Sequence, residues 1–452
     1  MANPLPTTIY LMFQLFVSGA SNDVFPAQCE LDNQVRDIIC HIGTTGNVHH
    51  RLGFVVGPIS FNQNDAQVHK LIADSFEIAR KQNAAVAFHI DDHMFWDKQA
   101  DLVRDYTNVE WIDWNGTLCT GRRLDWGPQP TKAPPQLCFN SPAVQVAVRR
   151  RARVIGADIA QQLARLRTEG REDLFGGVIT GWETQIGRDF STNRSTGYHA
   201  LRNAGLNARS SQAECDNKLQ SIVKDFIQMW AMELKQSGVP RQKLFSHIAF
   251  TSQGLGDSPE DFPQRVGYAA PSVVFGNCSI PGFSTYPSDG ALEEIGLTVK
   301  NRGQSTWISA EGTNVVPDGM PGETTMESYL AKMFNHGAIL VNIFSWGIGG
   351  TSEKANLFRR ATENDEALAA YRKFLEGLPL QELARPANQL SVKGLQKKIR
   401  TIQAEAPLWV RRTGRVGDLQ ARMSELDGAI KAGRVADADK SADKILKLIH
   451  TN

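Results

Sequence analysis

The chain has 452 residues, of which 41% are hydrophobic and 21% charged, and its formal net charge is +1. This composition is ordinary for a soluble globular protein, and the near-zero charge provides no basic surface of the kind that attracts nucleic acid or an anionic membrane. The length allows one large domain with an accessory piece, or two to three domains.

The first apolar run covers residues 9–17. It has the length of a signal-peptide core, but no Lys or Arg precedes it and Gln14 interrupts it. We therefore interpret it as a buried strand rather than a targeting segment. No run in the sequence is apolar over the length needed to span a membrane.

Apolar runs typical of strands alternate with segments of helical periodicity along the first 375 residues. This alternation predicts an α/β fold, a (β/α)8 TIM barrel with enlarged loops over residues 1–378. A doubly wound open sheet is the alternative, but no GxGxxG loop follows an early strand. The eight predicted strands are residues 9–17, 52–56, 85–90, 178–179, 244–250, 272–275 running on toward Phe283 and Tyr286, 305–314 and 339–344. The predicted helices are residues 33–40, a helix capped by Asp65, residues 141–168, a helix around 222–230, and residues 291–299, 324–335, 353–360 and 366–375.

A long excursion, residues 97–140, follows the third strand and is too long for a simple connection. It contains Trp111, Trp114 and Trp126, which could line sugar subsites or simply pack. Of the six cysteines none forms a CxxC pair, which argues against a zinc ribbon. Cys119 and Cys138 flank a Gly- and Pro-rich loop, and they are either bridged, if the protein is exported, or free buried thiols.

The last part of the chain, residues 379–452, has a different pattern. Three apolar stripes at helical spacing predict a small helical appendage. Pro407 and Gly433 lie between the stripes and are interpreted as helix breaks. We expect this appendage to pack on the barrel or to contact a partner chain, with no catalytic role.

Two glutamates follow predicted strands in a similar setting. Glu183 lies beside Trp182 after the fourth strand, and Glu311 lies beside Gly312 at the end of the seventh. The carboxyl ends of barrel strands face one mouth, so these side chains can meet across it. Hydrolysis of a glycosidic bond requires two such carboxyls, one as proton donor and one as nucleophile or base. The alternative is that each is an ordinary solvated or ion-paired glutamate.

This arrangement resembles clan A, the large clan of retaining (β/α)8 glycoside hydrolases, which carry an acid/base Glu after strand four and a nucleophile Glu after strand seven. The resemblance implies that Glu183 is the acid/base and Glu311 the nucleophile. It also implies that Trp346 stacks on a sugar and that Tyr286 touches the nucleophile. The clan usually has Asn before the acid/base, whereas this chain has Trp182. The expected contact to the sugar 2-hydroxyl is therefore not implied, and Trp182 is taken as a substrate contact.

The third strand ends in the motif HIDDH, residues 89–93. Strand alternation predicts that His89, Asp91 and His93 share one side and that Asp92 points to the other. Such a face could bind a divalent metal, but metal-dependent barrel hydrolases usually carry HxH on strand one, which has no His here. We favour hydrogen bonds from these four residues to sugar hydroxyls and expect no metal. His247 is interpreted as a satisfied core histidine.

The sequence thus predicts a glycoside hydrolase that uses its two glutamates, by retaining double displacement and without a cofactor. The alternatives are an inverting hydrolase with the same glutamates and a non-catalytic carbohydrate-binding barrel. The expected partner is a carbohydrate, with neither nucleic acid nor membrane. The expected location is secreted or periplasmic, with the leader not visible in this chain.

Overall fold

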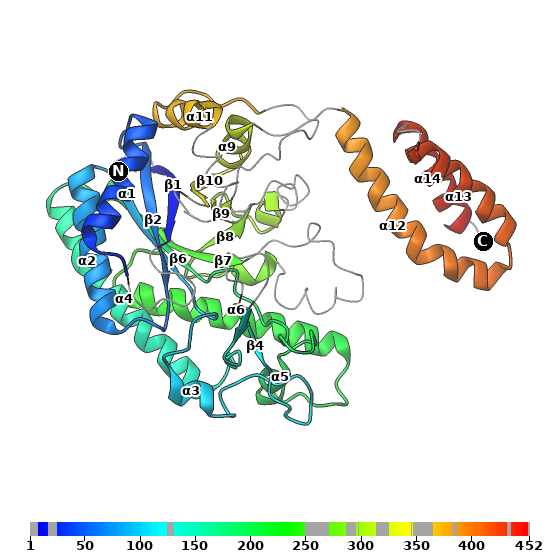
Figure 1. Cartoon of the computed structure of the whole chain (residues 1–452), viewed down its shortest axis with the longest axis horizontal. Coiled ribbons are helices and arrows are strands. Elements are labelled where there is room, and N and C mark those ends of the chain that lie inside the picture. The colour runs from blue at the N-terminus through cyan, green and yellow to red at the C-terminus, as the bar shows by residue number, and fades with distance from the viewer. Residues whose placement is uncertain are drawn as a thin grey trace. The chain divides into compact units, whose positions relative to one another are not determined.

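Eight parallel strands close into a barrel, and each strand pairs with the strands before and after it in barrel order (Figure 1). The computed structural model describes residues 8–16, 25–123, 131–248, 271–285, 295–296, 298–312, 325–344, 346, 365–382, 387–431 and 435–450. The predicted (β/α)8 TIM barrel is confirmed. The barrel strands are β1 (Ile9–Phe16), β2 (His50–Ile59), β3 (Ala85–Ile90), β6 (Phe175–Thr180), β7 (Leu244–Ile248), β8 (Ile280–Ser284), β9 (Trp307–Gly312) and β10 (Ala338–Ile343).

Helices cover the outside of the barrel and bury the outward-facing strand residues in one continuous apolar layer. Their apolar stripes at helical spacing explain this packing. Asn64, and not the predicted Asp65, caps the second helix, because the Asn64 side chain accepts from the backbone of Gln67. The helices are α1 (Gln28–Ile42), α2 (Asp65–Gln82), α4 (Pro142–Thr168), α6 (Gln212–Gln236), α9 (Met326–Phe334) and α11 (Asp365–Leu375).

The sixth barrel strand begins later than predicted: its predicted continuation toward Phe283 is a strand, but its predicted start is not. Most of the run at 272–275 lies in a short 3-10 helix, Pro271–Val274, and its apolar residues are buried without forming a strand. The strand is β8, which pairs with both neighbours even though it contains Pro281 and Gly282. Proline and glycine weaken the sequence signal of a strand interior, which explains why this strand was placed too early.

The excursion after β3 forms a small structure of its own. It contains the short helix α3 (Ala100–Arg104) and the antiparallel pair β4 (Gly121–Arg123) and β5 (Thr131–Ala133). A further short helix, α5 (Tyr198–Asn203), follows β6. Trp126, the predicted helix at 353–360 and most of the predicted helix at 291–299 lie outside the described residues.

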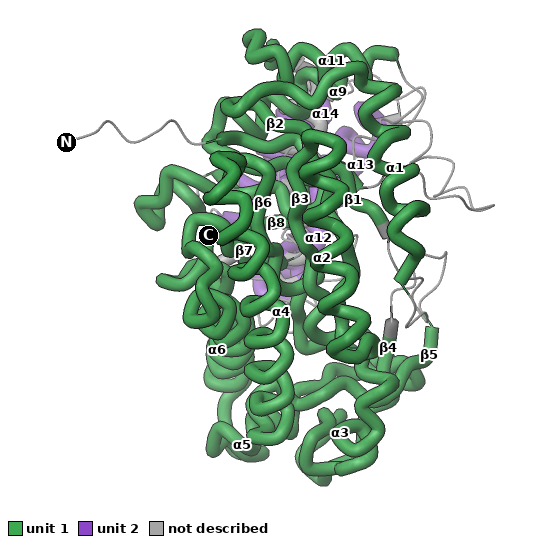
Figure 2. The backbone as a smooth tube through the Cα atoms, turned by 90° about the vertical axis from the view of Figure 1, so that its left-hand side faces the viewer, with its two compact units in different colours: residues 1–316, 325–382 green, residues 317–324, 383–452 purple. Residues whose placement is uncertain are grey.

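The chain divides into two compact units, residues 1–316 with 325–382 and residues 317–324 with 383–452 (Figure 2). In the second unit, α12 (Ala387–Thr413), α13 (Val416–Lys431) and α14 (Val435–His450) share one apolar core. The predicted break at Pro407 is wrong, because this proline lies inside α12. The helix ends at Gly414, whose φ of 69° suits glycine, and Gly433 lies outside the described residues. Within the part of the chain described, no helix has the length and apolarity to cross a bilayer.

Candidate active site

The inside of the barrel is apolar at one level and polar at the next. Along four strands, an apolar side chain of the inner cluster is followed two residues later by a buried polar one, since alternate residues of a strand face the same side. The polar level lies toward the carboxyl ends of the strands, where barrel active sites occur. The pairs are Met12 and Gln14, Ala87 and His89, Phe245 and His247, and Leu340 and Asn342.

Glu183 follows β6 through a tight turn. Gly181 has a φ of 87° and Glu183 a φ of 58°, the left-handed region that residues other than glycine rarely adopt. At Gly181 a Cβ atom would lie 2.3 Å from Oγ1 of Thr184 and 2.9 Å from a backbone oxygen of β7. Backbone strain such as that at Glu183 costs about 1–3 kcal/mol and concentrates at functional sites. The turn directs the Glu183 carboxyl to Ser284, which donates a hydrogen bond to its Oε1.

The direction of Glu311 results from a β-bulge in β9. Ala310 belongs to the inner cluster, so regular alternation would turn Glu311 outward. The pairing with β8 slips at this point, because Phe283 pairs with Ser309 while the next residue of β8 pairs with Glu311. A bulge redirects the side chain that follows it. Glu311, only 2% exposed, therefore also faces the inner side of the barrel.

The two carboxyl groups approach each other closely. One oxygen of Glu183, one oxygen of Glu311 and one ring nitrogen of His247 all lie within 4.8 Å of one another. The three residues come from the carboxyl-terminal ends of three different barrel strands, β6, β9 and β7. Two carboxyl groups at this spacing can act on the two atoms of a single bond.

Burial dominates the electrostatics of Glu183. It raises the pKa of this carboxyl, while the hydrogen bond from Ser284 and the charge of His93 oppose the rise. A carboxyl with a raised pKa keeps its proton closer to neutral pH, as a general acid must. For His93 burial disfavours the imidazolium, yet the hydrogen bond and charge of Asp92, together with the charges of Asp91 and Glu183, raise its pKa.

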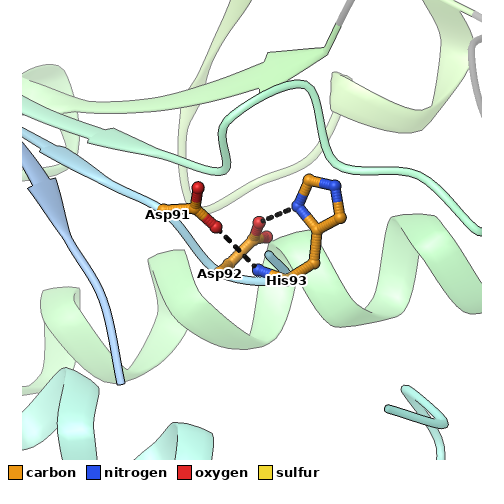
Figure 3. A group of neighbouring side chains, drawn as sticks. All are labelled: Asp91, Asp92 and His93. Carbon is orange, nitrogen blue, oxygen red and sulfur yellow. Dashed lines mark hydrogen bonds and ion pairs between the residues drawn. The ribbon is translucent and has the colours of Figure 1, made fainter. Parts of the chain in front are cut away.

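The HIDDH motif does not form the predicted face (Figure 3). Because β3 ends at Ile90, strand alternation does not extend to the last three residues of the motif. Asp91 accepts from the backbone nitrogen of His93 at 3.2 Å. Asp92 lies on the same side, accepting from Nδ1 of His93 at 3.0 Å and from Thr184 Oγ1 at 2.7 Å. The prediction that Asp92 points away from its neighbours is therefore wrong.

The predicted sugar contacts of the motif stay a prediction, and the structure shows what these residues bind within the protein. His89, Asp91 and Asp92 are fully buried and bind protein groups. Of the four motif residues predicted to bind sugar, His93 alone retains some exposure, 8% of its side chain. The motif therefore binds mainly to groups of the protein, and His93 is its most exposed member.

Two groups of side chains have donor atoms that suit a divalent cation, each with its ligand atoms within 4.8 Å of one another. In one group the hydroxyl of Ser284 bridges a glutamate and a histidine. In the other, Asp92 is bonded to Thr184 as well as to its own neighbour. Hydrogen bonds therefore already orient both groups. The groups are Glu183, His247 and Glu311, and Asp91, Asp92 and His93.

The tryptophans predicted to contact a sugar bind other residues of the protein. Trp182 stacks on His89, with ring centroids 3.9 Å apart and an interplanar angle of 9°. Trp346, 5% exposed, donates from its indole nitrogen to Asp37 of α1 at 2.8 Å. Both rings therefore make contacts within the protein, and their contacts to a sugar stay a prediction. Tyr286 lies outside the described residues.

Ser284 and Thr184 carry no sequence signal of their own, and both were missed. Each binds a residue far away in the chain, as Ser284 does with Glu183, 101 residues earlier. His247 is indeed a buried histidine with both ring nitrogens hydrogen-bonded. Its position two residues after the inward-facing Phe245 is the signal that could have placed it in the site.

The excursion holds a buried carboxyl of its own, Glu110. Burial raises the pKa of Glu110 to about 7, although hydrogen bonds from the backbone of Ala200 and from Cys138 oppose this. Cys119 and Cys138 are free, buried thiols in the structure. Burial and the charge of Glu110 raise the pKa of both. Of the two states expected from sequence, the structure has the free thiols.

Comparison with known proteins gives similarity of fold only. A scan against protein-family models and a search of curated proteins both found no match. Among solved structures, the catalytic domain of β-amylase from Paenibacillus polymyxa matches 82% of this chain and 99% of its own, with 7% identity and a TM-score of 0.51. The glycoside hydrolase domain of PgaB (BpsB) from Bordetella bronchiseptica matches 81% and 99%, with 12% identity and a TM-score of 0.45. A sugar phosphate isomerase/epimerase from Parabacteroides distasonis matches 78% and 96%, with 9% identity and a TM-score of 0.40. The barrel fold that the resemblance to clan A implies is confirmed.

Proposed function

We propose that this chain is a glycoside hydrolase that cleaves a glycosidic bond with Glu183 and Glu311. The observation that carries the proposal is the approach of the two carboxyl oxygens to within 4.8 Å at the carboxyl ends of the barrel strands. The shared fold with a β-amylase domain is compatible with this activity, but at 7% identity a fold does not define a reaction.

In the proposed reaction, Glu183 is the acid and then the base. Its raised pKa favours the protonated form, which gives its proton to the glycosidic oxygen as the bond to the anomeric carbon breaks. The Glu311 carboxylate attacks that carbon and forms a glycosyl ester. Glu183, now a carboxylate, removes a proton from a water molecule that attacks the same carbon and releases Glu311.

The spacing of the carboxyls favours retention of configuration over inversion. Retaining enzymes hold the two groups about 5–5.5 Å apart, whereas inverting enzymes need about 6.5–9.5 Å to admit a water between carboxylate and sugar. One pair of carboxyl oxygens lies at most 4.8 Å apart, which is nearer to the first range than to the second and supports retention.

The test uses Glu183→Gln and Glu311→Gln, assayed separately on a panel of aryl glycosides. Each change should lower kcat/KM about 10²–10⁴-fold, the usual size of an acid–base or nucleophile contribution. Glu77→Gln, at an exposed position on α2, is the matched control and should leave activity unchanged. A substrate with a leaving group that needs no protonation should restore the first step in Glu183→Gln but not in Glu311→Gln.

The same assay separates the alternatives. Unchanged activity in both variants would refute the proposal. Loss of wild-type activity to a chelator would show a metal-dependent hydrolase instead. A wild-type protein that binds sugars without cleaving any of the panel would be a non-catalytic carbohydrate-binding barrel.

A further inference from the structure

Glu183 is the end of a buried hydrogen-bonded chain that runs across the barrel. Ser284 donates to Oε1 of Glu183, and Nε2 of His247 lies 2.9 Å from the Ser284 hydroxyl oxygen. The other ring nitrogen of His247, Nδ1, lies 3.1 Å from Nε2 of His89. The chain thus joins strands β3, β7 and β8 to the turn after β6.

A backbone carbonyl favours one direction of this hydrogen-bonded chain. Nε2 of His89 also lies 3.0 Å from the carbonyl oxygen of Gly181, which can only accept and cannot rotate. This contact favours a hydrogen on Nε2 of His89, with Nδ1 of His247 as its acceptor. His247 then holds its own hydrogen on Nε2 and donates it to Ser284, which turns the serine hydrogen toward Glu183.

The reversed direction is the competing arrangement. Nδ1 of His89 lies 3.2 Å from Oε1 of Gln14, an acceptor that Asn342 already binds at 3.0 Å. If His89 donated from Nδ1 alone, every bond of the chain would reverse and Glu183 would donate to Ser284. In that arrangement the lone pair on Nε2 of His89 would face the Gly181 carbonyl oxygen at 3.0 Å, which is shorter than the 3.2 Å from Nδ1 to Gln14. Burial lowers the pKa of His247 to about 3, so its ring is neutral, which both directions allow. In the reversed direction the ring hydrogen would lie on Nδ1, and His247 also interacts with the Gly181 backbone.

We propose that Ser284 and His247, held by His89, are positioning residues that confine the acid proton of Glu183 to its other oxygen, Oε2. This inference rests on the proposed function. With Oε1 occupied as an acceptor, the proton that leaves for the glycosidic oxygen departs from Oε2, and the proton taken from water returns to Oε2. The protons of Ser284 and the two histidines stay on their own atoms throughout.

The ring tautomers can be read without any activity. In protein labelled with ¹⁵N in its histidine rings, NMR should find His247 neutral with its hydrogen on Nε2 and His89 with a hydrogen on Nε2. A hydrogen on Nδ1 of His247 would overturn the inference, whatever the outcome for Glu183→Gln and Glu311→Gln in the activity assay. A failure of the inference can therefore be told apart from a failure of the proposed function.

The kinetic test uses Ser284→Ala. Loss of one hydrogen bond to a charged group should lower kcat about tenfold or more and leave KM nearly unchanged. Ser284→Thr, which keeps the hydroxyl, should restore most of the rate. The matched control is Ser246→Ala, a buried serine of β7 whose hydroxyl binds Ser279 at 2.6 Å and not the glutamate. An equal loss in Ser246→Ala, or no rescue by Ser284→Thr, would assign Ser284 a merely structural role.

Discussion

Replacing His247 with glutamine should make the barrel less sensitive to acid. Burial, with a smaller contribution from the charge of His93, lowers the pKa of His247 from its ordinary 6.5 to about 3, although a hydrogen bond to the Gly181 backbone opposes this. Below pH 6.5 the unfolded chain binds a proton on this ring and the folded chain does not. The free energy of unfolding must therefore fall as the pH falls through 6.5 toward 3.

The size of this effect follows from the two pKa values. At pH 4.5 the folded ring is still neutral and the unfolded ring is charged, so the group destabilises the native state by about 3 kcal/mol, at about 1.36 kcal/mol for each pH unit below 6.5. His247→Gln lacks this group but keeps an amide that can donate to Ser284. Between pH 7.5 and 4.5 the variant should lose about 3 kcal/mol less stability than the wild type.

Urea unfolding followed by tryptophan fluorescence at the two pH values measures this difference. All other titrating groups are present in both proteins, so the comparison isolates the ring. His49→Gln, at an exposed position, is the control and should follow the wild type. An identical pH dependence for His247→Gln and the wild type would refute a neutral, buried His247 in the folded protein.

Three further predictions concern the surroundings of the site. Gly57→Ala should destabilise the barrel by about 1–3 kcal/mol, because its Cβ would lie 2.8 Å from a backbone oxygen of β3. Gly428→Ala in α13, with no described atom within 4 Å of its Cβ, should stabilise its unit by up to about 1 kcal/mol. Thermal unfolding that ranked the two changes the other way would contradict this packing. His93→Gln removes a positive charge that lowers the pKa of Glu183, so the basic limb of the kcat/KM profile should move to higher pH, and an unmoved limb would exclude the charge interaction. Cys119, whose pKa burial raises to about 12, should resist alkylation at pH 8 until the protein unfolds, which mass spectrometry of the labelled peptide can check.

Most of the fold could be predicted because buried parallel strands are short, continuous apolar runs between amphipathic helices. The prediction failed where local propensity and tertiary structure disagree. Pro281 and Gly282 weaken the sequence signal of β8, whose pairing is determined by its neighbours in the barrel. Pro407 lies inside α12, where the shared core of three helices outweighs the cost of a proline.

The approach of the two glutamates could be predicted because each lies at or just after the carboxyl end of a strand, and strand ends meet at one mouth of a barrel. The side chains and backbone features that surround the two glutamates could not be predicted from the sequence. The bulge that turns Glu311 inward is a property of strand pairing. The hydrogen bonds of Ser284 and Thr184 join segments about 90–100 residues apart, a distance over which periodicity carries no information. The side predicted for Asp92 in the HIDDH motif was wrong because β3 ends at Ile90 and strand alternation does not extend beyond it.

The central claim is that Glu311 attacks the sugar while Glu183 supplies and recovers a proton. It is tested most directly by inactivating the enzyme with the 2-deoxy-2-fluoro form of whichever aryl glycoside it cleaves, followed by mass spectrometry of the digested protein. We expect a single sugar ester on Glu311, and no label in Glu311→Gln. A stable ester on any other carboxyl would contradict it.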